Sequence, residues 1–195
     1  ANDNVAIGYQ SLTTNTTGCQ NVAVGNCALY ATTTGVVNTA IGYNSLTANT
    51  TGGSNIAIGP AALCANTTGC WNVAVGSGSM KTTSTGNRNA GLGHNHLSSN
   101  TTGSGNTAVG GLNAGTYPVM YANTTGSHNT ALGSAALFNN TTGDQNVAIG
   151  WLAGTDAMIN ITTEDNRAVF GHNSITNAYV KVAWTVTSDL RDKTN

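Results

Sequence analysis

The sequence predicts an all-β protein, a repetitive parallel β-solenoid or β-roll with about 17 residues per coil. Ten strings on the pattern Asn–x–Ala–aliphatic–Gly recur along the 195 residues, most of them 17 residues apart, and two of the ten are the variants NAGLG from Asn89 and RAVFG from Arg167. A second glycine closes an Asn–Thr–Thr–Gly segment or a close variant in most repeats. A fixed period of this kind indicates one short structural unit that is stacked on copies of itself.

The first half of each repeat reads as a short strand, in which a small Ala lies between two larger residues. Stacking of the coils places equivalent residues above one another. The Asn that opens each string is therefore expected to join an amide ladder, in which each side chain bonds to the next. That ladder would comprise Asn4, Asn21, Asn38, Asn55, Asn72, Asn89, Asn106, Asn129 and Asn146.

The second half of each repeat carries a large aliphatic residue four positions after the first glycine, and we expect a second short extended segment there. The two glycine ladders predict two tight bends per repeat, because glycine tolerates positive φ. A hairpin reading fits less well, since the two-residue Asn-Gly and Asp-Gly loops that hairpins favour are absent. A helical reading fails, since each of the two glycines per repeat would cost about 1 kcal/mol.

Composition excludes several functions. Only 7% of the residues are charged and the net charge is −1, so the chain lacks the basic footprint that nucleic-acid binding needs. It also lacks an apolar run of about 18 residues, which membrane insertion would require. The chain opens inside a repeat, without an initial Met or a signal peptide, and we expect it to be a piece of a longer protein.

Four cysteines occur, and no pair has the spacing of zinc ligands. Cys19 and Cys70 share one repeat position but lie three repeats apart, which is about 14 Å in a stack of strands and beyond disulfide reach. We expect these two residues, with Cys27 and Cys64, to be structural thiols that pack as small apolar groups.

Two insertions break the period. Six extra residues lie between Gly110 and Gly126, and four more lie between Gly150 and the last string. Tyr117, Tyr121 and Trp151 lie in these segments, so we expect them to be receptor contacts, or alternatively to cover a gap between chains. A solenoid this thin encloses little volume. Its other apolar side is therefore expected to pack against identical chains about a three-fold axis, giving a homotrimer.

His94 and His96 form a His-x-His pair, and on an extended strand both side chains would point the same way. In a three-fold assembly six imidazoles could then meet on the axis and bind a metal ion such as iron, nickel or zinc. The alternative is a pair of satisfied or exposed histidines. No other cofactor is expected.

An enzyme is not expected. Glycoside hydrolysis needs two facing carboxyl groups, and the acids Asp156, Glu164 and Asp165 read as solvated loop residues. A phosphate-binding loop is missing from the sequence. The recurrent Asn-x-Thr triplets match glycosylation acceptors, but we expect their side chains to form hydrogen bonds at the corners of the coils instead.

Three regions are expected: a shaft of repeats over 1–165, a terminal strand segment over 166–187 in which YVKVAWTV alternates, and a last region over 188–195. That region, SDLRDKTN, resembles the Ser-Asp-x-Arg-x-Lys opening of the intramolecular chaperone domain at the C-terminus of phage tail fibres, tail spikes and endosialidases, and Ser188, Asp189, Arg191 and Lys193 match it. The repeats resemble those of cyanophage-like tail fibres and, more loosely, the heads of trimeric autotransporter adhesins.

In the chaperone family three chains assemble and the chaperone is then released by self-cleavage at or beside the serine. The resemblance implies that Ser188 is the nucleophile and Lys193 its assisting base in the full-length precursor. It also implies a virion protein, the shaft of a trimeric phage tail fibre that contacts a glycan or protein of the host surface through its inserted loops. A trimeric adhesin head on a bacterial surface is the alternative, and a polysaccharide-degrading spike is a third class.

Overall fold

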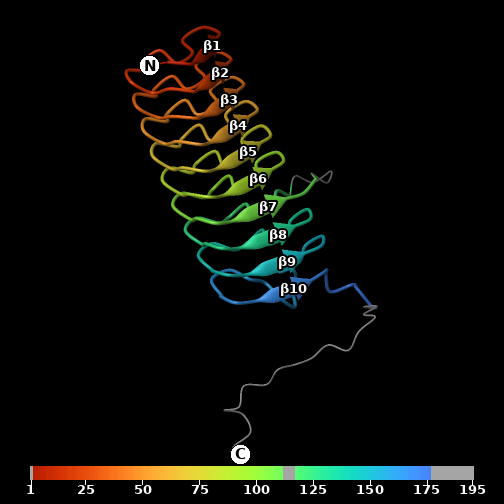
Figure 1. Cartoon of the computed structure of the whole chain (residues 1–195). Coiled ribbons are helices and arrows are strands. Elements are labelled where there is room, and N and C mark those ends of the chain that lie inside the picture. The colour runs from red at the N-terminus through yellow and green to blue at the C-terminus, as the bar shows by residue number, and fades with distance from the viewer. Residues whose placement is uncertain (1, 112–116, 177–195) are drawn as a thin grey trace, which may run out of the picture.

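The computed structural model describes residues 2–111 and 117–176, and it confirms the predicted parallel β-solenoid (Figure 1). Ten three-residue strands form one parallel sheet in sequence order. The strands are β1 (Val5–Ile7), β2 (Val22–Val24), β3 (Thr39–Ile41), β4 (Ile56–Ile58), β5 (Val73–Val75), β6 (Ala90–Leu92), β7 (Thr107–Val109), β8 (Thr130–Leu132), β9 (Val147–Ile149) and β10 (Ala168–Phe170).

The strands pair in the register that the repeat predicts, since the central Ala of one strand lies beside the central Ala of the next, as in Ala23 and Ala40. The register survives both insertions. Ala108 of β7 pairs with Ala131 of β8 although that coil is six residues longer than the others. The ladder of strands therefore continues in register past the insertion.

The repeat ladder also extends beyond the expected shaft boundary at residue 165. β10 pairs in register with β9, and Val169 takes the place that Ala148 has in the coil before it. Among the described residues there is no helix long and apolar enough to cross a membrane. The alternating segment 179–186 and the residues 188–195 lie outside the described residues.

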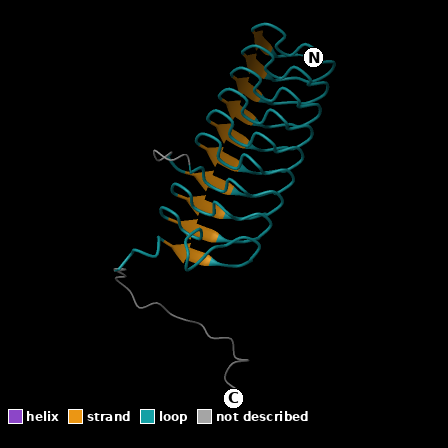
Figure 2. Ribbon diagram, turned by 180° about the vertical axis from the view of Figure 1, so that it is seen from behind, coloured by secondary structure: helices purple, strands orange, loops and turns teal. Residues whose placement is uncertain are grey.

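Within 2–111 and 117–176 each coil contributes one strand, and the second extended segment that we expected is not found there (Figure 2). After the glycine that ends a strand, the chain turns twice through residues in the left-handed region. In the second coil these are Cys27 and Leu29, with φ of 57° and 51°. Two left-handed residues so close together curl the backbone and prevent an extended segment.

Two columns of side chains run through most of the core of the solenoid. One is the residue at the centre of the strands, which is Ala in most of them, and the other is the large aliphatic residue four positions after the glycine, as in Leu29 and Leu46, which are fully buried. Small residues just before that aliphatic residue, such as Ala28, are buried beside them. Burying one such leucine stabilises the fold by about 1.5–3 kcal/mol. A single coil has only one of them, so stacking is what builds the core.

The two glycine ladders have different causes. Glycines that end the strands have positive φ, as predicted, for example 135° at Gly25. The glycines of the second ladder do not, so positive φ was the wrong reason for them. A Cβ placed on Gly35 would lie 2.6 Å from the carbonyl oxygen of Gly52, and close approach of neighbouring coils explains this ladder.

Candidate functional site

The outer face of the sheet is a continuous apolar surface, which we call the outer sheet face. It consists of the residues on either side of the central residue of each strand, which is buried in every strand from β2 to β10. Those that are large, apolar and exposed are Val5, Ile7, Ile41, Ile56, Ile58, Val75, Leu92, Leu132, Ile149 and Phe170. Parallel sheets are normally covered on both faces, whereas in a single chain this one is covered on only one.

The outer sheet face is long, narrow and uncharged. Ten strands about 4.8 Å apart and three residues wide give an area of about 480 Å². The largest apolar patch on a typical monomer has a similar area, about 300–600 Å², and such a patch is often functional. No strand residue carries a charge, and Thr39, Thr107 and Thr130 are the polar ones. Such a surface is suited to apolar packing and not to the recognition of ions or nucleic acid.

The predicted amide ladder is present and holds the coils in register. Asn38 donates a side-chain hydrogen bond to Oδ1 of Asn21 at 3.1 Å and another to the carbonyl oxygen of Gly52 at 2.9 Å. Its backbone N–H donates to the same Oδ1 of Asn21 at 2.9 Å. The opening Asn residues from Asn21 to Asn146 are buried with these bonds satisfied, so the ladder makes the outer sheet face a rigid surface.

The first insertion creates a small aromatic cluster, which we define as Tyr117, Tyr121 and Phe138. The ring of Tyr121 stacks on that of Phe138 at 5.4 Å, and Tyr117 meets the same ring edge-on at 6.0 Å. A cavity of about 380 Å³ beside them is lined by Asn95, Pro118, Tyr121 and Phe138. Both tyrosines are exposed, so the cluster offers ring surface to a partner.

The structure thus brings together two of the three predicted contact residues. Trp151 lies apart from them and packs against His172, with ring centroids 5.0 Å apart. Phe138 was missed in the sequence, although a signal was available, because it follows Tyr121 by one repeat of 17 residues and must lie beside it in the stack.

His94 and His96 are not on a strand, so the expectation that their side chains point the same way is wrong. Both lie in the turns that follow β6. His94 is exposed, whereas His96 is fully buried inside the coil. Nε2 of His96 lies 2.8 Å from the carbonyl oxygen of Gly110, and Nδ1 accepts a hydrogen bond from the backbone N–H of Val119 at 3.3 Å. Neither ring nitrogen of His96 is left for a metal.

The imidazole of His96 replaces a backbone hydrogen bond that the insertion breaks. In other coils the residue at this position donates its N–H to the glycine that ends the strand, as Ala136 does to Gly133 at 3.1 Å. In the inserted coil the equivalent pair is Val119 and Gly110, which the extra residues separate. His96 reaches from the neighbouring coil and bonds to both.

Burial lowers the pKa of His96, because a charged imidazolium loses its hydration inside the coil. The charge of the neighbouring His94 also lowers the pKa of His96, and the hydrogen bonds with the backbone of Gly110 and of His94 raise it. An Nδ1 that accepts a hydrogen bond requires the neutral ring with its proton on Nε2. The structure therefore fits a neutral His96.

No family model, curated protein or solved structure matches this chain. The function must therefore be argued from the surfaces described above and from the resemblances of the sequence.

Asp156 and Glu164, which were predicted to be loop residues, accept hydrogen bonds from the backbone of the loops in which they lie. Asp156 accepts hydrogen bonds from the backbone N–H groups of Met158, Ile159 and Asn173, each at 2.9 Å. Its pKa is lowered, mainly by the bond from Ile159. Glu164 likewise accepts the N–H of Thr162 at 2.7 Å.

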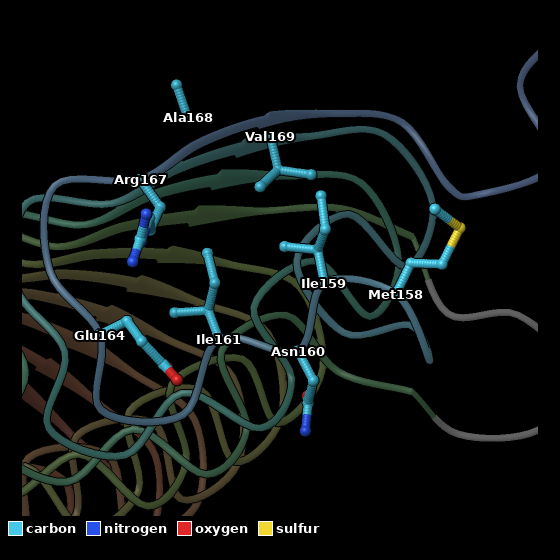
Figure 3. Close-up of a pocket in the computed structure, with 8 residues that line it drawn as sticks. All are labelled: Met158, Ile159, Asn160, Ile161, Glu164, Arg167, Ala168 and Val169. Atoms are coloured by element: carbon cyan, nitrogen blue, oxygen red, sulfur yellow. The ribbon is translucent and has the colours of Figure 1, made fainter.

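The second insertion and β10 enclose a cavity of about 410 Å³ at the C-terminal end of the ladder (Figure 3). The side chains of Ile159, Ile161 and Val169 point towards one another across it, while Asn160 points away. Glu164 and Arg167 are the two charged residues of its lining. This lining offers one carboxylate and not the facing pair of a glycosidase.

Among the residues the structure describes, no three His, Cys, Asp or Glu side chains lie together as metal ligands would. The four cysteines are free and half-buried. Cys64 donates to the carbonyl oxygen of Lys81 and Cys70 to that of Thr68, so these two thiols have polar partners and are more exposed than we expected. Ser188 and Lys193 lie outside the described residues.

Proposed function

We propose that this chain is the shaft of a homotrimeric phage tail fibre, with three solenoids packed side by side through their outer sheet faces. The observation that carries the proposal is the row of exposed aliphatic residues along an otherwise rigid parallel sheet. An exposed apolar patch of this extent is typical of an interaction surface.

A second and third copy of the chain are the partners that suit this face best. The face repeats the same residue types at every coil, and a copy offers the same repeat along the same axis. Ile58 of one coil and Ile41 of the coil before it, for example, could meet the equivalent pair of another chain without a change of register. The face is uncharged, so no like charges would be brought together.

The number three and the phage origin rest on the resemblances of the sequence. SDLRDKTN at 188–195 matches the start of a chaperone domain that serves trimeric fibres. In the full-length precursor Ser188 and Lys193 would then take part in self-cleavage, as nucleophile and assisting base. The protein itself would act as a long, rigid part of the virion, and not as an enzyme.

The aromatic cluster is the proposed point of contact with the host surface. Tyr117, Tyr121 and Phe138 stand beside the first insertion, where the coil departs from an otherwise uniform shaft. Tyrosine offers a large apolar surface with a polar tip, which suits contact with a glycan or a protein.

The solution mass of the chain tests this function. We expect light scattering to give three times the 19.6 kDa of one chain. A monomer would remove the shaft proposal, because the outer sheet face would then be stable in water without a partner, and a dimer would remove the three-fold arrangement. Mass spectrometry of the full-length precursor tests the cleavage, and an uncut product after assembly would count against Ser188.

A further inference from the structure

Among the residues that the structure describes, two hydrogen bonds that other coils make are missing or long at the base of the inserted coil. Pro118 has no N–H, whereas the equivalent residue of other coils donates to the coil before it, as Ala61 does to Tyr43 at 2.8 Å. The bond from Gly110 N–H to Leu92 is 3.5 Å long, against 2.7 Å for the equivalent bond from Gly93 to Val75.

We propose that His96 is a pH-sensitive latch, which joins Gly110 to Val119 when the imidazole is neutral and releases them when the imidazole is protonated. We call this pair of residues the neck, and His96 bonds to one residue through each ring nitrogen. The latch does not depend on the proposed function.

The chemistry of the ring sets the direction of the switch. Neutral His96 donates from Nε2 to Gly110 and accepts at Nδ1 from Val119, so both neck residues are satisfied. Protonation converts Nδ1 into a donor. It would then face the N–H of Val119, a second donor, while the ring carries a charge in a buried position.

The surroundings of His96 offer little to stabilise a buried charge. Gly110, Val119 and Met80, from the coils on either side, carry no ionisable group. Lys81 follows Met80 but is exposed. His94 is the one titratable side chain of the described residues with a recorded effect on His96, and its charge disfavours protonation.

The loss of the two hydrogen bonds of His96 would have only a local effect. The backbone N–H of Leu97 donates to the carbonyl oxygen of Val119 at 3.1 Å, and this bond does not depend on the ionisation of His96. The two coils would therefore stay stacked while the neck opens. The aromatic cluster would stay in place as well. The carbonyl oxygen of Tyr117 accepts from the N–H of Ala135 at 3.0 Å, and the residues on either side of Tyr121 donate to the next coil at 3.0 Å each.

The direction of the pH response follows from the linkage between protonation of His96 and opening of the neck. The closed neck binds the neutral ring, which lowers the pKa of His96, and an open neck returns the ring to its ordinary value of about 6.5. The closed form is thus fully favoured above about pH 6.5. As the pH falls from there towards the lowered pKa, the equilibrium for opening rises about tenfold for each pH unit.

Amide hydrogen exchange of the assembled protein, read by NMR or by mass spectrometry with residue resolution, tests the latch. The amide of Ala136 is the internal control, since it makes the direct bond to Gly133 that Val119 lacks. We expect the protection of Val119 relative to Ala136 to fall between about pH 7.5 and about pH 5, by about tenfold for each pH unit between about 6.5 and the lowered pKa of His96. An unchanged ratio over that range would overturn the proposal.

Variants assign the effect to His96. In His96→Ala the Val119 amide should be unprotected at both pH values, and the coil should tolerate the change because Ala occupies this position at Ala28, Ala62 and Ala136. His94→Gln should keep the pH response. If His96→Ala kept the acid response, another group would be responsible and the latch would be wrong.

The ring itself gives a second measurement that needs no variant. Nitrogen chemical shifts at about pH 7.5 should show His96 as the neutral form protonated on Nε2. A charged ring or the other tautomer would contradict the geometry on which the latch is built. Light scattering at both pH values separates the two proposals. A monomer would contradict the proposed fibre and leave the latch unaffected. A constant ratio of Val119 to Ala136 protection would contradict the latch and leave the trimer unaffected.

Discussion

The side-chain amide of Asn66 donates a hydrogen bond to Oδ1 of Asn49 at 2.8 Å, yet Oδ1 of Asn66 is buried and has no partner among the described residues. The cause is the next residue in this column, Thr83, whose shorter side chain provides no amide. The same defect occurs at Asn15 and Asn140, where the column continues with Thr32 and Ile161.

Thr83→Asn is therefore expected to stabilise the protein. The new amide would donate to Oδ1 of Asn66 and accept from Asn100, which now bonds to Thr83 at 3.3 Å. One buried hydrogen bond gained should raise the free energy of unfolding by about 0.5–1.5 kcal/mol. Chemical denaturation measures it, with Thr85→Asn on the exposed surface as control. A variant no more stable than the native chain would show that the column does not accept a further Asn.

Gly35→Ala should destabilise the solenoid by about 1–3 kcal/mol or more. The added Cβ would lie 2.6 Å from the carbonyl oxygen of Gly52, and backbone of a neighbouring coil cannot move aside without breaking the ladder. Thermal unfolding measures the loss. Gly111→Ala is the control, because a Cβ at Gly111 meets nothing within 4 Å. Equal melting temperatures for the two variants would refute close packing as the reason for this glycine.

Ile58→Glu should dissociate the proposed trimer. It places a charge at the middle of the outer sheet face, where a buried carboxylate without a partner costs several kcal/mol. Thr51→Glu adds the same charge at an exposed corner and should leave the mass unchanged. Light scattering compares the two. Retention of the native mass by Ile58→Glu would place the contact between chains elsewhere.

The loop of the second insertion should open in acid. The pKa of Asp156 is lowered in the folded state, mainly by the hydrogen bond from Ile159, so this stabilisation is complete above the ordinary value near 3.8. It is lost as the pH falls through the lowered pKa. Amide exchange of Met158, Ile159 and Asn173 between about pH 6 and about pH 3 should show the loss.

Asp156→Asn should remove the acid dependence of those three amides. Asp165→Asn is the control, since Asp165 accepts its hydrogen bond from the N–H of Asp144 and not from this loop. Exchange that responds equally to both substitutions would mean that the acid effect is general and not due to Asp156.

The spacing of the sequence predicted the features that repeat. The period fixed the stack, the amide ladder from Asn21 onwards and the buried column that includes Leu46, because each depends only on equivalent residues lying above one another. The corner hydrogen bonds also follow from the period, as in the donation from Asn49 to the carbonyl oxygen of Gly52 at 3.0 Å.

The features that sequence reasoning missed arise within one coil or from a local exception. Left-handed φ at Cys27 and Leu29 has no residue signature, because neither is a residue that favours that region. His96 was recognised as unusual, but its role depends on a broken bond between Gly110 and Val119 that only the folded coil reveals. The number of chains and the fate of Ser188 and Lys193 remain predictions.

β7 and β8 keep their pairing although the coil between them is longer than its neighbours. The pairing of β7 with β8 therefore does not depend on the number of residues between Gly110 and Tyr117. Segments of different size and composition could be exchanged there while the coils on either side keep their register. The architecture is thus a modular scaffold, in which a segment with a new binding specificity can be inserted at one position without a change to the rest of the solenoid.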